Sequence, residues 1–306
     1  MNHPIIDING LNKYFAAEHI VKNLTVQVAQ GEIFGFLGPN GSGKTTAIRM
    51  MCGLLSPSSG QGRCMGLDII KDKEKIKKSV GYMTQYFSLW GALSVRQNLT
   101  FVARMYQLEH PVARVEEVMA QFALTERQHQ LARTLSGGWK QRLSLAACLI
   151  HHPKVIFLDE PTAGVDPAAR QVFWRELYRV AAQGVTILVS THYMDEAERC
   201  NSLAYIVKGR MLIQGKPNDI INSQKLYSWE IAGRDLPALE KRLLANAEIA
   251  HACQRGNLLY ITARQELPLA EMIDKFQPGY QICRCPLSLE DIFSCLSNGS
   301  ALIEAC

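Results

Sequence analysis

The sequence predicts an α/β fold with a parallel sheet, on three observations. A glycine-rich segment, residues 38–46, joins an apolar run at 33–37 to a helical pattern at 47–55. Two further apolar runs, 155–160 and 185–190, are rich in β-branched residues. Parallel strands buried on both faces of a sheet are built from such runs, with helices between them. A chain of 306 residues has room for one large domain of this kind and a smaller one.

Residues 38–46 carry the strongest chemical signal, because they fit the pattern G-x-x-x-x-G-K-[ST] between a strand and a helix. The glycines let backbone N–H groups converge on an anion, and the following helix presents the positive end of its dipole there. Lys44 would bind the β- and γ-phosphates, and the Thr45 hydroxyl can ligate Mg²⁺. The alternative is a tight turn with an exposed lysine. The predicted strand before the segment and the predicted helix after it disfavour that alternative, so we expect a nucleoside triphosphate site. Its residues are Gly38, Pro39, Asn40, Gly41, Ser42, Gly43, Lys44, Thr45 and Thr46.

Polar side chains follow both of the later apolar runs. The run 155–158 leads directly into Asp159 and Glu160, at the end of the strand where α/β sheets bind ligands. Asp159 can hold Mg²⁺ directly or through water, and Glu160 can polarise an attacking water. The run 185–190 leads to His192, which can reach a γ-phosphate from that position, although a lone histidine is usually structural.

Composition and charge are those of an ordinary globular protein. The chain has 33 Lys and Arg against 28 Asp and Glu, an excess too small to argue for nucleic acid. An odd number of cysteines, 9, without a C-x-x-C pair favours reduced thiols in a cytosolic protein, and Cys283 and Cys285 fit strand packing better than a metal site. Residues 1–7 do not read as a signal peptide, and no apolar run reaches the roughly 18 residues of a membrane span.

The first half of the chain adds short strands, a basic helix and a helical insert. Tyr14 lies between two predicted strands, where its ring could stack on a purine or face the core. Gln85 ends the strand before an aromatic loop, 86–90, which is either buried or awaits a partner. The basic segment 71–78 is typical of a solvated helix face. In order, we predict strands at 5–11 and 20–28, a loop at 56–62, a tight turn at 64–66, a strand at 80–85, and helices at 94–108 and 112–122.

A second potential anion site begins the helix after residue 135. Ser136, Gly137 and Gly138 would leave free N–H donors at this helix start, although the pattern taken alone favours simple helix capping. Beyond the two central strands the sequence predicts a turn at 161–167, helices at 168–182 and 195–200, and a hairpin of strands 202–207 and 210–215.

The pattern changes after residue 215, and we place a domain boundary between residues 220 and 221, giving domains 1–220 and 221–306. The order of the elements that follow suggests a split βαβ module of the ferredoxin-like kind. They are strands at 226–231, 248–253, 258–262 and 280–284 and helices at 236–247, 269–276 and 289–296.

Taken in order, the motifs of residues 5–215 closely resemble the ATP-binding subunit of an ATP-binding-cassette (ABC) transporter. Residues 38–46 look like the Walker A loop and 155–160 like Walker B, while 135–138 match the signature that separates this family from other P-loop ATPases. The resemblance implies a P-loop NTPase cassette, with a RecA-like core, an antiparallel β subdomain and a helical subdomain at about residues 90–150. A small C-terminal α+β domain would follow.

The resemblance also assigns roles to single residues. Glu160 would be the catalytic carboxylate, His192 the switch histidine and Gln85 the glutamine of the Q-loop. Asp159 and Thr45, with Gln85, would hold Mg²⁺. The residues implied to contact ATP are Tyr14, those of 38–46, Ser136, Gly137, Gly138 and, in the segment that matches the D-loop, Asp166.

In this family two cassettes pack head to tail, and each ATP lies between the Walker A loop of one and the signature of the other. The chain holds one cassette, so a second copy or a paralogue is implied. The sequence departs from the family at Trp139, where many cassettes have glutamine. Because indole offers one donor and no acceptor, any hydrogen bond made by that amide is in doubt.

The tail from residue 226 is similar to the C-terminal extension of ABC-2-type exporter ATPases of the multidrug and antibiotic-resistance kind. This match rests mainly on residues 289–293, which a generic amphipathic helix explains equally well. The resemblance implies an ATP-hydrolysing motor, peripheral at the cytoplasmic face of the bacterial inner membrane, with a separate integral membrane permease as its partner. No nucleic acid is expected. The alternative is a soluble ABC ATPase acting on ribosomes or nucleic acid, but such relatives carry two cassettes or a long coiled coil.

Overall fold

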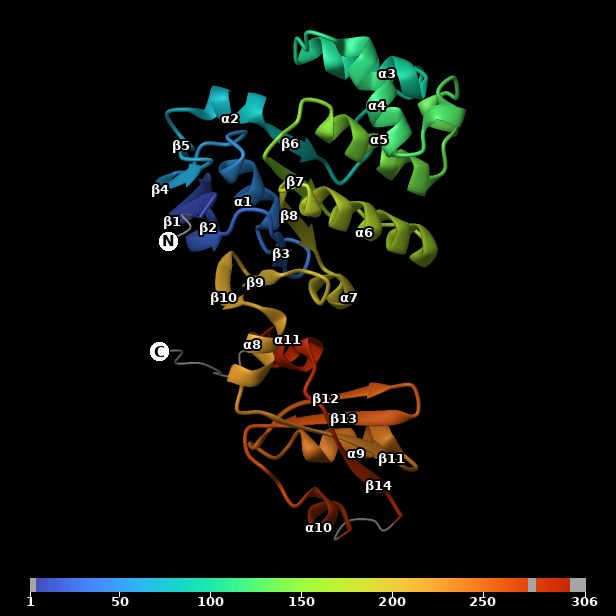
Figure 1. Ribbon diagram of the computed structural model, residues 1–306. Coiled ribbons are helices and arrows are strands. Elements are labelled where there is room, and N and C mark those ends of the chain that lie inside the picture. Colours follow the sequence, from blue (N-terminus) through green and yellow to red (C-terminus); the bar gives the residue numbers. More distant parts are fainter. Residues whose placement is uncertain (1–3, 275–278, 298–306) are drawn as a thin grey trace. The chain divides into compact units, whose positions relative to one another are not determined.

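The computed structural model describes residues 4–274 and 279–297 (Figure 1). The chain divides into two compact units, Met1–Gln214 and Gly215–Cys306. Among the described residues, two clusters of buried apolar side chains lie in the first unit and a third in the second. The division follows Gln214, whereas the boundary expected from the sequence lies between residues 220 and 221.

The first unit is built on a six-stranded sheet of, in spatial order, β10 (Arg210–Gly215), β9 (Ser202–Val207), β3 (Ile33–Leu37), β8 (Thr186–Thr191), β7 (Val155–Asp159) and β6 (Val80–Met83). Strand β3 pairs in parallel with β8 and β9, and β7 pairs in parallel with β6 and β8. Every residue of β3, β7 and β8 is buried, because helices cover the sheet, and this explains why their sequences are apolar throughout. The predicted parallel strands are confirmed.

A second sheet of the first unit is antiparallel and runs in the order β2 (Glu18–Val28), β1 (Ile6–Phe15), β4 (Ser59–Cys64) and β5 (Leu67–Asp68). The loop predicted at 56–62 is therefore wrong, since most of it is strand. Its glycines allow close pairing with β1: a Cβ on Gly60 would lie 2.3 Å from the Gly10 carbonyl oxygen, and one on Gly62 would lie 2.6 Å from Ile8 Cδ1.

The helices of the first unit are α1 (Lys44–Met51), α2 (Lys73–Ser79), α3 (Val95–Met105), α4 (Pro111–Gln121), α5 (Gly137–Leu149), α6 (Pro167–Ala182) and α7 (Met194–Ala197), with 3₁₀ turns at Thr125–Arg127 and Ala132–Thr134. Helices α3 and α4 pack together as the predicted helical insert, seen at the top of Figure 1. Pro167, predicted to end a turn, instead starts α6, because proline is tolerated at the first helical position.

The second unit contains a four-stranded antiparallel sheet in the order β12 (Ile249–Arg255), β13 (Leu258–Ala263), β11 (Tyr227–Ala232) and β14 (Gln281–Cys285). With α9 (Leu236–Leu243) and α10 (Leu269–Asp274) the chain order is βαββαβ, as the sequence predicts. The helix predicted at 269–276 extends beyond the described residues. Helix α8 (Pro217–Ser223), which the sequence reading missed, and α11 (Leu289–Ser297) flank this module in the chain.

No described helix is both long and apolar enough to cross a membrane. The cysteines between Cys52 and Cys295 are free thiols, and Cys306 lies outside the described residues. Burial raises the pKa of Cys52 to about 12 and that of Cys64 to about 12. Strand packing explains Cys285, whose Sγ lies 3.5 Å from Ser228 Oγ, but not Cys283, which is exposed.

Candidate active site

The glycine-rich segment forms a loop between β3 and α1 that surrounds the amino group of Lys44. Lys44 Nζ donates hydrogen bonds to the carbonyl oxygens of Gly38 at 2.7 Å and Pro39 at 3.1 Å, and it lies 3.3 Å from Glu160 Oε1. The side chain is 4% exposed. Burial lowers the pKa of Lys44, and the nearby Glu160 carboxylate partly opposes this shift. The loop therefore holds a buried cation beside a carboxylate at the start of a helix.

The backbone of this loop requires glycine at two positions. A Cβ on Gly38 would lie 2.1 Å from the carbonyl oxygen of Ile206, and Gly43 has φ +99°, in the left-handed region. Inside the loop, Ser42 Oγ is buried and has no hydrogen-bond partner among the described residues. A buried hydroxyl without a partner fits a ligand that brings its own acceptor atoms, such as the phosphate oxygens of a nucleotide.

Asp159 is the last residue of β7, and its carboxylate accepts hydrogen bonds from hydroxyl groups of three other elements. It accepts hydrogen bonds from Thr45 Oγ1 at 2.9 Å, Ser190 Oγ at 2.8 Å and Tyr82 Oη at 3.4 Å. Among the described residues no group of three or more His, Cys, Asp or Glu side chains could hold a metal ion. Thr45 and Asp159 nevertheless fit Mg²⁺, which takes few protein oxygens and fills its remaining positions with water and substrate phosphate.

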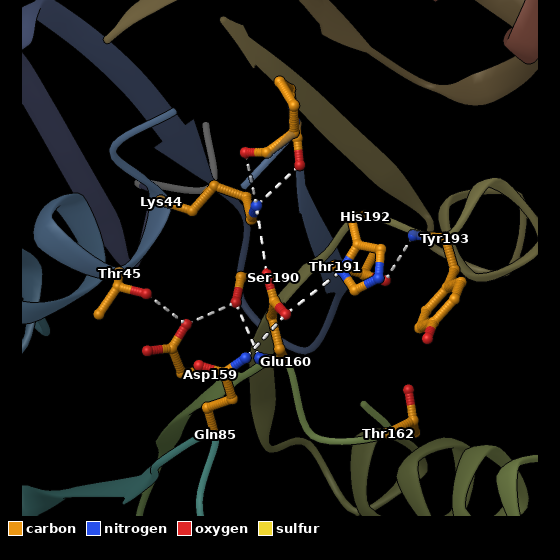
Figure 2. Close-up of polar contacts among 12 residues, drawn as sticks. Lys44, Thr45, Gln85, Asp159, Glu160, Thr162, Ser190, Thr191, His192 and Tyr193 are labelled. Carbon is orange, nitrogen blue, oxygen red and sulfur yellow. Dashed lines mark hydrogen bonds and ion pairs between the residues drawn. The ribbon is translucent and has the colours of Figure 1, made fainter. Parts of the chain in front are cut away.

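The residue after Asp159 lies at the centre of the site. Glu160 has a side chain 10% exposed, and Figure 2 shows it between Lys44, Gln85 and His192. Gln85 Nε2 donates to Glu160 Oε2 at 3.2 Å, and His192 Nδ1 lies 3.2 Å from the same oxygen. The structure thus brings together the residues that the sequence singles out at 44, 45, 85, 159, 160 and 192.

The backbone of Glu160 is strained, with φ +47° in a region that non-glycine residues seldom adopt. Two bonds from β8 support this conformation, because the Glu160 N–H donates to Ser190 Oγ at 2.9 Å and to the Ser190 carbonyl oxygen at 3.2 Å. Ser190 therefore positions the Asp159 carboxylate and the backbone of Glu160, a role that the sequence does not reveal. The available signal was a serine placed between an apolar strand and His192.

A second surface contains the signature segment. Ser136, Gly138 and Asp166 line a hollow of about 190 Å³ together with Trp139 and Arg142. Asp166 accepts a bond from the Ala169 N–H at 2.9 Å and caps α6. Gly138 lies close to α6, since a Cβ there would be 2.9 Å from Ala169 Cβ, whereas Gly137 faces open space. No hydrogen bond or ion pair of the described residues joins this surface to Lys44 or Glu160.

Trp139 and Tyr14 are both engaged with other side chains. The Trp139 ring carries the guanidinium groups of Arg127 and Arg142, whose central carbons lie 4.4 Å and 4.8 Å from the ring centroid. Tyr14 belongs to β1 rather than to a connection between strands, and its ring stacks on His19 at 3.9 Å. It is 47% exposed, so it does not face the core.

Comparison with known proteins gives consistent matches. A family model described as ABC transporter matches residues 21–163. The chain is 41% identical over 221 residues to YbhF, a probable multidrug ABC transporter ATP-binding protein of Escherichia coli strain K12; this covers 71% of the chain but only 38% of that relative. It is 37% identical to the Nod factor export ATP-binding protein I of Ralstonia nicotianae, over 95% of this chain and 92% of the relative.

Solved structures agree on the fold. The chain is similar to cbiO1 from Clostridium perfringens, described as part of the ABC transporter complex cbiONQ, with a TM-score of 0.67 and 29% identity over 72% of this chain and 92% of that one. It also matches the dimeric post-hydrolysis cassette MJ0796 bound to ADP and Pi, with a TM-score of 0.63 and 23% identity over 69% of this chain and 98% of that one. The second match concerns the fold alone.

Proposed function

Since the chain belongs to the ABC transporter family of ATP-binding proteins, as its match to a relative over nearly their whole lengths establishes, we propose that it hydrolyses Mg-ATP as the motor subunit of a membrane exporter. The observation that carries this proposal is the convergence of Lys44, Asp159 and Glu160 at the carboxyl ends of β3 and β7. A buried cation, a metal-ligating pair and a carboxylate in one place are what phosphoryl transfer to water requires.

The loop 38–46 binds the triphosphate. Backbone N–H groups at the start of α1 and the Ser42 hydroxyl donate to phosphate oxygens, and Lys44 turns from Gly38 and Pro39 to the β- and γ-phosphates. Thr45 and Asp159, with Gln85, hold Mg²⁺, which when bound neutralises charge on the phosphates. Tyr14, exposed on β1, stacks on the adenine.

Glu160 orients the attacking water, and its neighbours hold its carboxylate in position. Lys44 supplies positive charge at 3.3 Å, while Gln85 donates a hydrogen bond to the other carboxylate oxygen. His192, at 3.2 Å from Glu160, contacts the γ-phosphate from the end of β8. In these roles the residues accelerate hydrolysis by positioning the water and the phosphate and by stabilising charge in the transition state.

A second cassette completes each site. The surface of Ser136, Gly137, Gly138 and Asp166 lies apart from Lys44 and Glu160 within one chain, so it meets the nucleotide of another copy or of a paralogue. Open space beside Gly137 leaves its backbone accessible to that nucleotide. A head-to-tail dimer follows, in which ATP joins the two chains and hydrolysis separates them.

The membrane partner docks near the aromatic loop 86–90. Tyr86 is 80% exposed and Trp90 46%, and a hollow of about 130 Å³ beside them is lined by Leu89, Met105 and Tyr106. Large exposed apolar groups of this kind mark an interaction surface, here for a cytoplasmic helix of a permease. The chain is then peripheral at the cytoplasmic face of the membrane. The names of the relatives, multidrug ABC transporter and Nod factor export protein, favour export.

The test is a comparison of the purified chain with Glu160→Gln. We expect Mg²⁺-dependent phosphate release from ATP by the wild type and a loss of about 10²- to 10⁴-fold in kcat for the variant, the usual contribution of a positioned general base. Light scattering should detect an ATP-stabilised dimer of the variant. The exposed Glu198→Gln serves as the control.

Unchanged turnover in Glu160→Gln would reject the catalytic role. Export requires a second result: the native protein should co-purify with an integral membrane protein from solubilised membranes, and Tyr86→Ser should weaken that association. Recovery only in large soluble assemblies would contradict the transporter function.

A further inference from the structure

The structure contains a buried carboxylate that the proposed mechanism leaves unused. Glu196 lies on the short helix α7, just beyond His192, and it is 1% exposed. A carboxylate is almost never buried to this extent without partners, because its charged form loses the stabilisation that water provides. Its partners therefore indicate what the residue does.

Three side chains face the Glu196 carboxylate from three different segments. Thr162 Oγ1, in the turn that follows Glu160, donates a hydrogen bond to Oε1. Thr191 Oγ1, at the end of β8, donates to Oε2 at 2.6 Å. The Arg170 Nε of helix α6 is buried and lies 3.6 Å from Oε1 without a formed hydrogen bond.

These bonds fix the loop that carries His192. Thr191 Oγ1 also accepts a hydrogen bond from the Tyr193 N–H at 3.0 Å, so the residues on both sides of His192 depend on one hydroxyl (Figure 2). The Tyr193 ring contacts the His192 ring, with 4.1 Å between the two centroids. The guanidinium carbon of Arg170, the residue whose Nε lies near Glu196, is 4.0 Å from the centroid of the Tyr193 ring.

The same carboxylate holds the turn after Glu160 and the start of α6. Thr162 is 1% exposed, and the turn closes through bonds from Ala163 N–H to the Glu160 carbonyl oxygen and from Val165 N–H to the Thr162 carbonyl oxygen. Asp166 then caps α6, one turn before Arg170. Glu196 is thus joined to the segment that follows Glu160, to the one that carries His192 and to the helix that Asp166 caps.

We propose that Glu196 is a positioning residue, which couples the His192 loop to the turn after Glu160 and to the N-terminus of α6. This rests on the proposed function, since His192 and Glu160 act on ATP and Asp166 faces the second cassette. A movement of α6 caused by the second cassette would reach His192 through Arg170 and Glu196. The bonds of Glu196 set geometry and do not contact ATP, so its loss lowers turnover more than nucleotide binding.

The experiment measures kcat and KM for ATP in the full-length protein with Glu196→Gln. The amide keeps the volume of the side chain but removes its charge and one acceptor. We expect kcat to fall about 10- to 100-fold, as small misplacements of catalytic groups do, with KM changed by no more than about twofold. Thr191→Val and Thr162→Val, which remove one donor each, should lower kcat in the same direction.

Glu176→Gln is the matched control, because Glu176 is 8% exposed on α6 and pairs with Arg179 at 3.2 Å away from this cluster. A second readout is the ¹⁵N chemical shift of the His192 ring, assigned by its absence in His192→Gln. That resonance should move in Glu196→Gln and stay in place in Glu176→Gln.

The proposal is overturned if Glu196→Gln keeps wild-type kcat, or if its kcat falls no more than that of Glu176→Gln while the His192 resonance stays in place. If Glu196→Gln does not fold, the two threonine variants decide by the same criteria. A wild type without ATPase activity would refute the proposed function, whereas the shift of the His192 resonance would still test the coupling.

Discussion

The two units place their buried polar groups for different purposes. In the first, Lys44, Asp159, Glu160 and Ser190 lie together at the carboxyl ends of the central strands, with Glu160 in a strained backbone conformation. In the second, the buried carboxylate of Asp291 belongs to a helix cap. The first arrangement costs stability and suits chemistry, whereas the second one stabilises the fold.

Asp291 explains the motif 289–293 on which the resemblance to exporter ATPases depends. Ser288 and Asp291 form a reciprocal cap at the start of α11, with the Asp291 N–H bonded to Ser288 Oγ at 3.2 Å and the Ser288 N–H bonded to Asp291 Oδ2 at 3.1 Å. Arg255 Nη2 of β12 lies 3.1 Å from the same carboxylate. Leu289, Ile292 and Phe293 of the motif are buried, and α11 contacts α8 and β12 of its own unit.

Among the substitutions that test this difference between the two units, Asp291→Ala is expected to have the largest effect on stability. The substitution removes the cap and leaves Arg255 without one of its partners, so we expect the second unit to lose about 2–4 kcal/mol of unfolding free energy. Hydrogen exchange over residues 227–263, followed by mass spectrometry, measures that loss. ATP hydrolysis by the first unit should change by less than about twofold.

Glu290→Ala is the control, because Glu290 pairs with Arg255 at 3.4 Å but is half-exposed, and such a pair contributes about 0–1 kcal/mol. Equal losses in the two variants, or a large fall in turnover with Asp291→Ala, would contradict the separation between a structural and a chemical unit.

A smaller effect is expected at His151, a partly buried group of the first unit that lies away from the proposed site. Its ring stacks on Tyr106 with 3.8 Å between centroids, and its Nε2 lies 3.1 Å from the carbonyl oxygen of Val80, the first residue of β6. Burial, more than the nearby positive charges, lowers the pKa of His151 from 6.5 to about 4. The fold therefore favours the neutral ring, and the group is structural rather than chemical.

The sign of the pH effect follows from that pKa. Between pH 6.5 and about 4 the unfolded chain binds a proton at His151 that the folded chain does not, so stability is fully present above pH 6.5 and is lost as the pH falls. Allowing for the solvent exposure of the ring, this is about 1–2 kcal/mol. His151→Phe keeps the stacking and should flatten the dependence by that amount. Urea unfolding of both proteins from pH 7 to 4.5 checks this, and parallel curves would refute it.

The sequence predicts the parallel sheet well because each of its central strands can be identified from its own residues. The runs 155–160 and 185–190 are apolar, β-branched and bounded by polar residues, and the Gly-Lys-Thr pattern after 33–37 has few structural alternatives. Strand β4 was missed because its polar, glycine-rich sequence becomes a strand only through pairing with β1. Local pattern cannot reveal pairing with a segment about fifty residues away.

In the candidate site, too, some residues can be predicted from local sequence patterns and others cannot. The identities of Lys44, Asp159 and Glu160 follow from motifs, whereas the support given by Ser190 and Glu196 depends on tertiary contacts. Serine before a histidine and glutamate after it have many ordinary explanations in a sequence. Their importance is visible only once burial and hydrogen bonds are known.

The smallest expected effect concerns Trp139, which lies on the signature surface of the first unit. Its ring packs between Arg127, at the 3₁₀ turn of the helical insert, and Arg142 on α5. Two such contacts at a partly exposed site are worth about 1 kcal/mol together. Trp139→Gln should lower the unfolding free energy by that amount, while Trp139→Phe, which keeps an aromatic face, should lower it less. Because Ser136 and Gly138 remain, we expect no more than about a twofold change in kcat. A fall in turnover well beyond twofold with Gln but not with Phe would show that the aromatic ring of residue 139 itself serves the chemistry. The signature surface would then differ in kind from the capping cluster of the second unit.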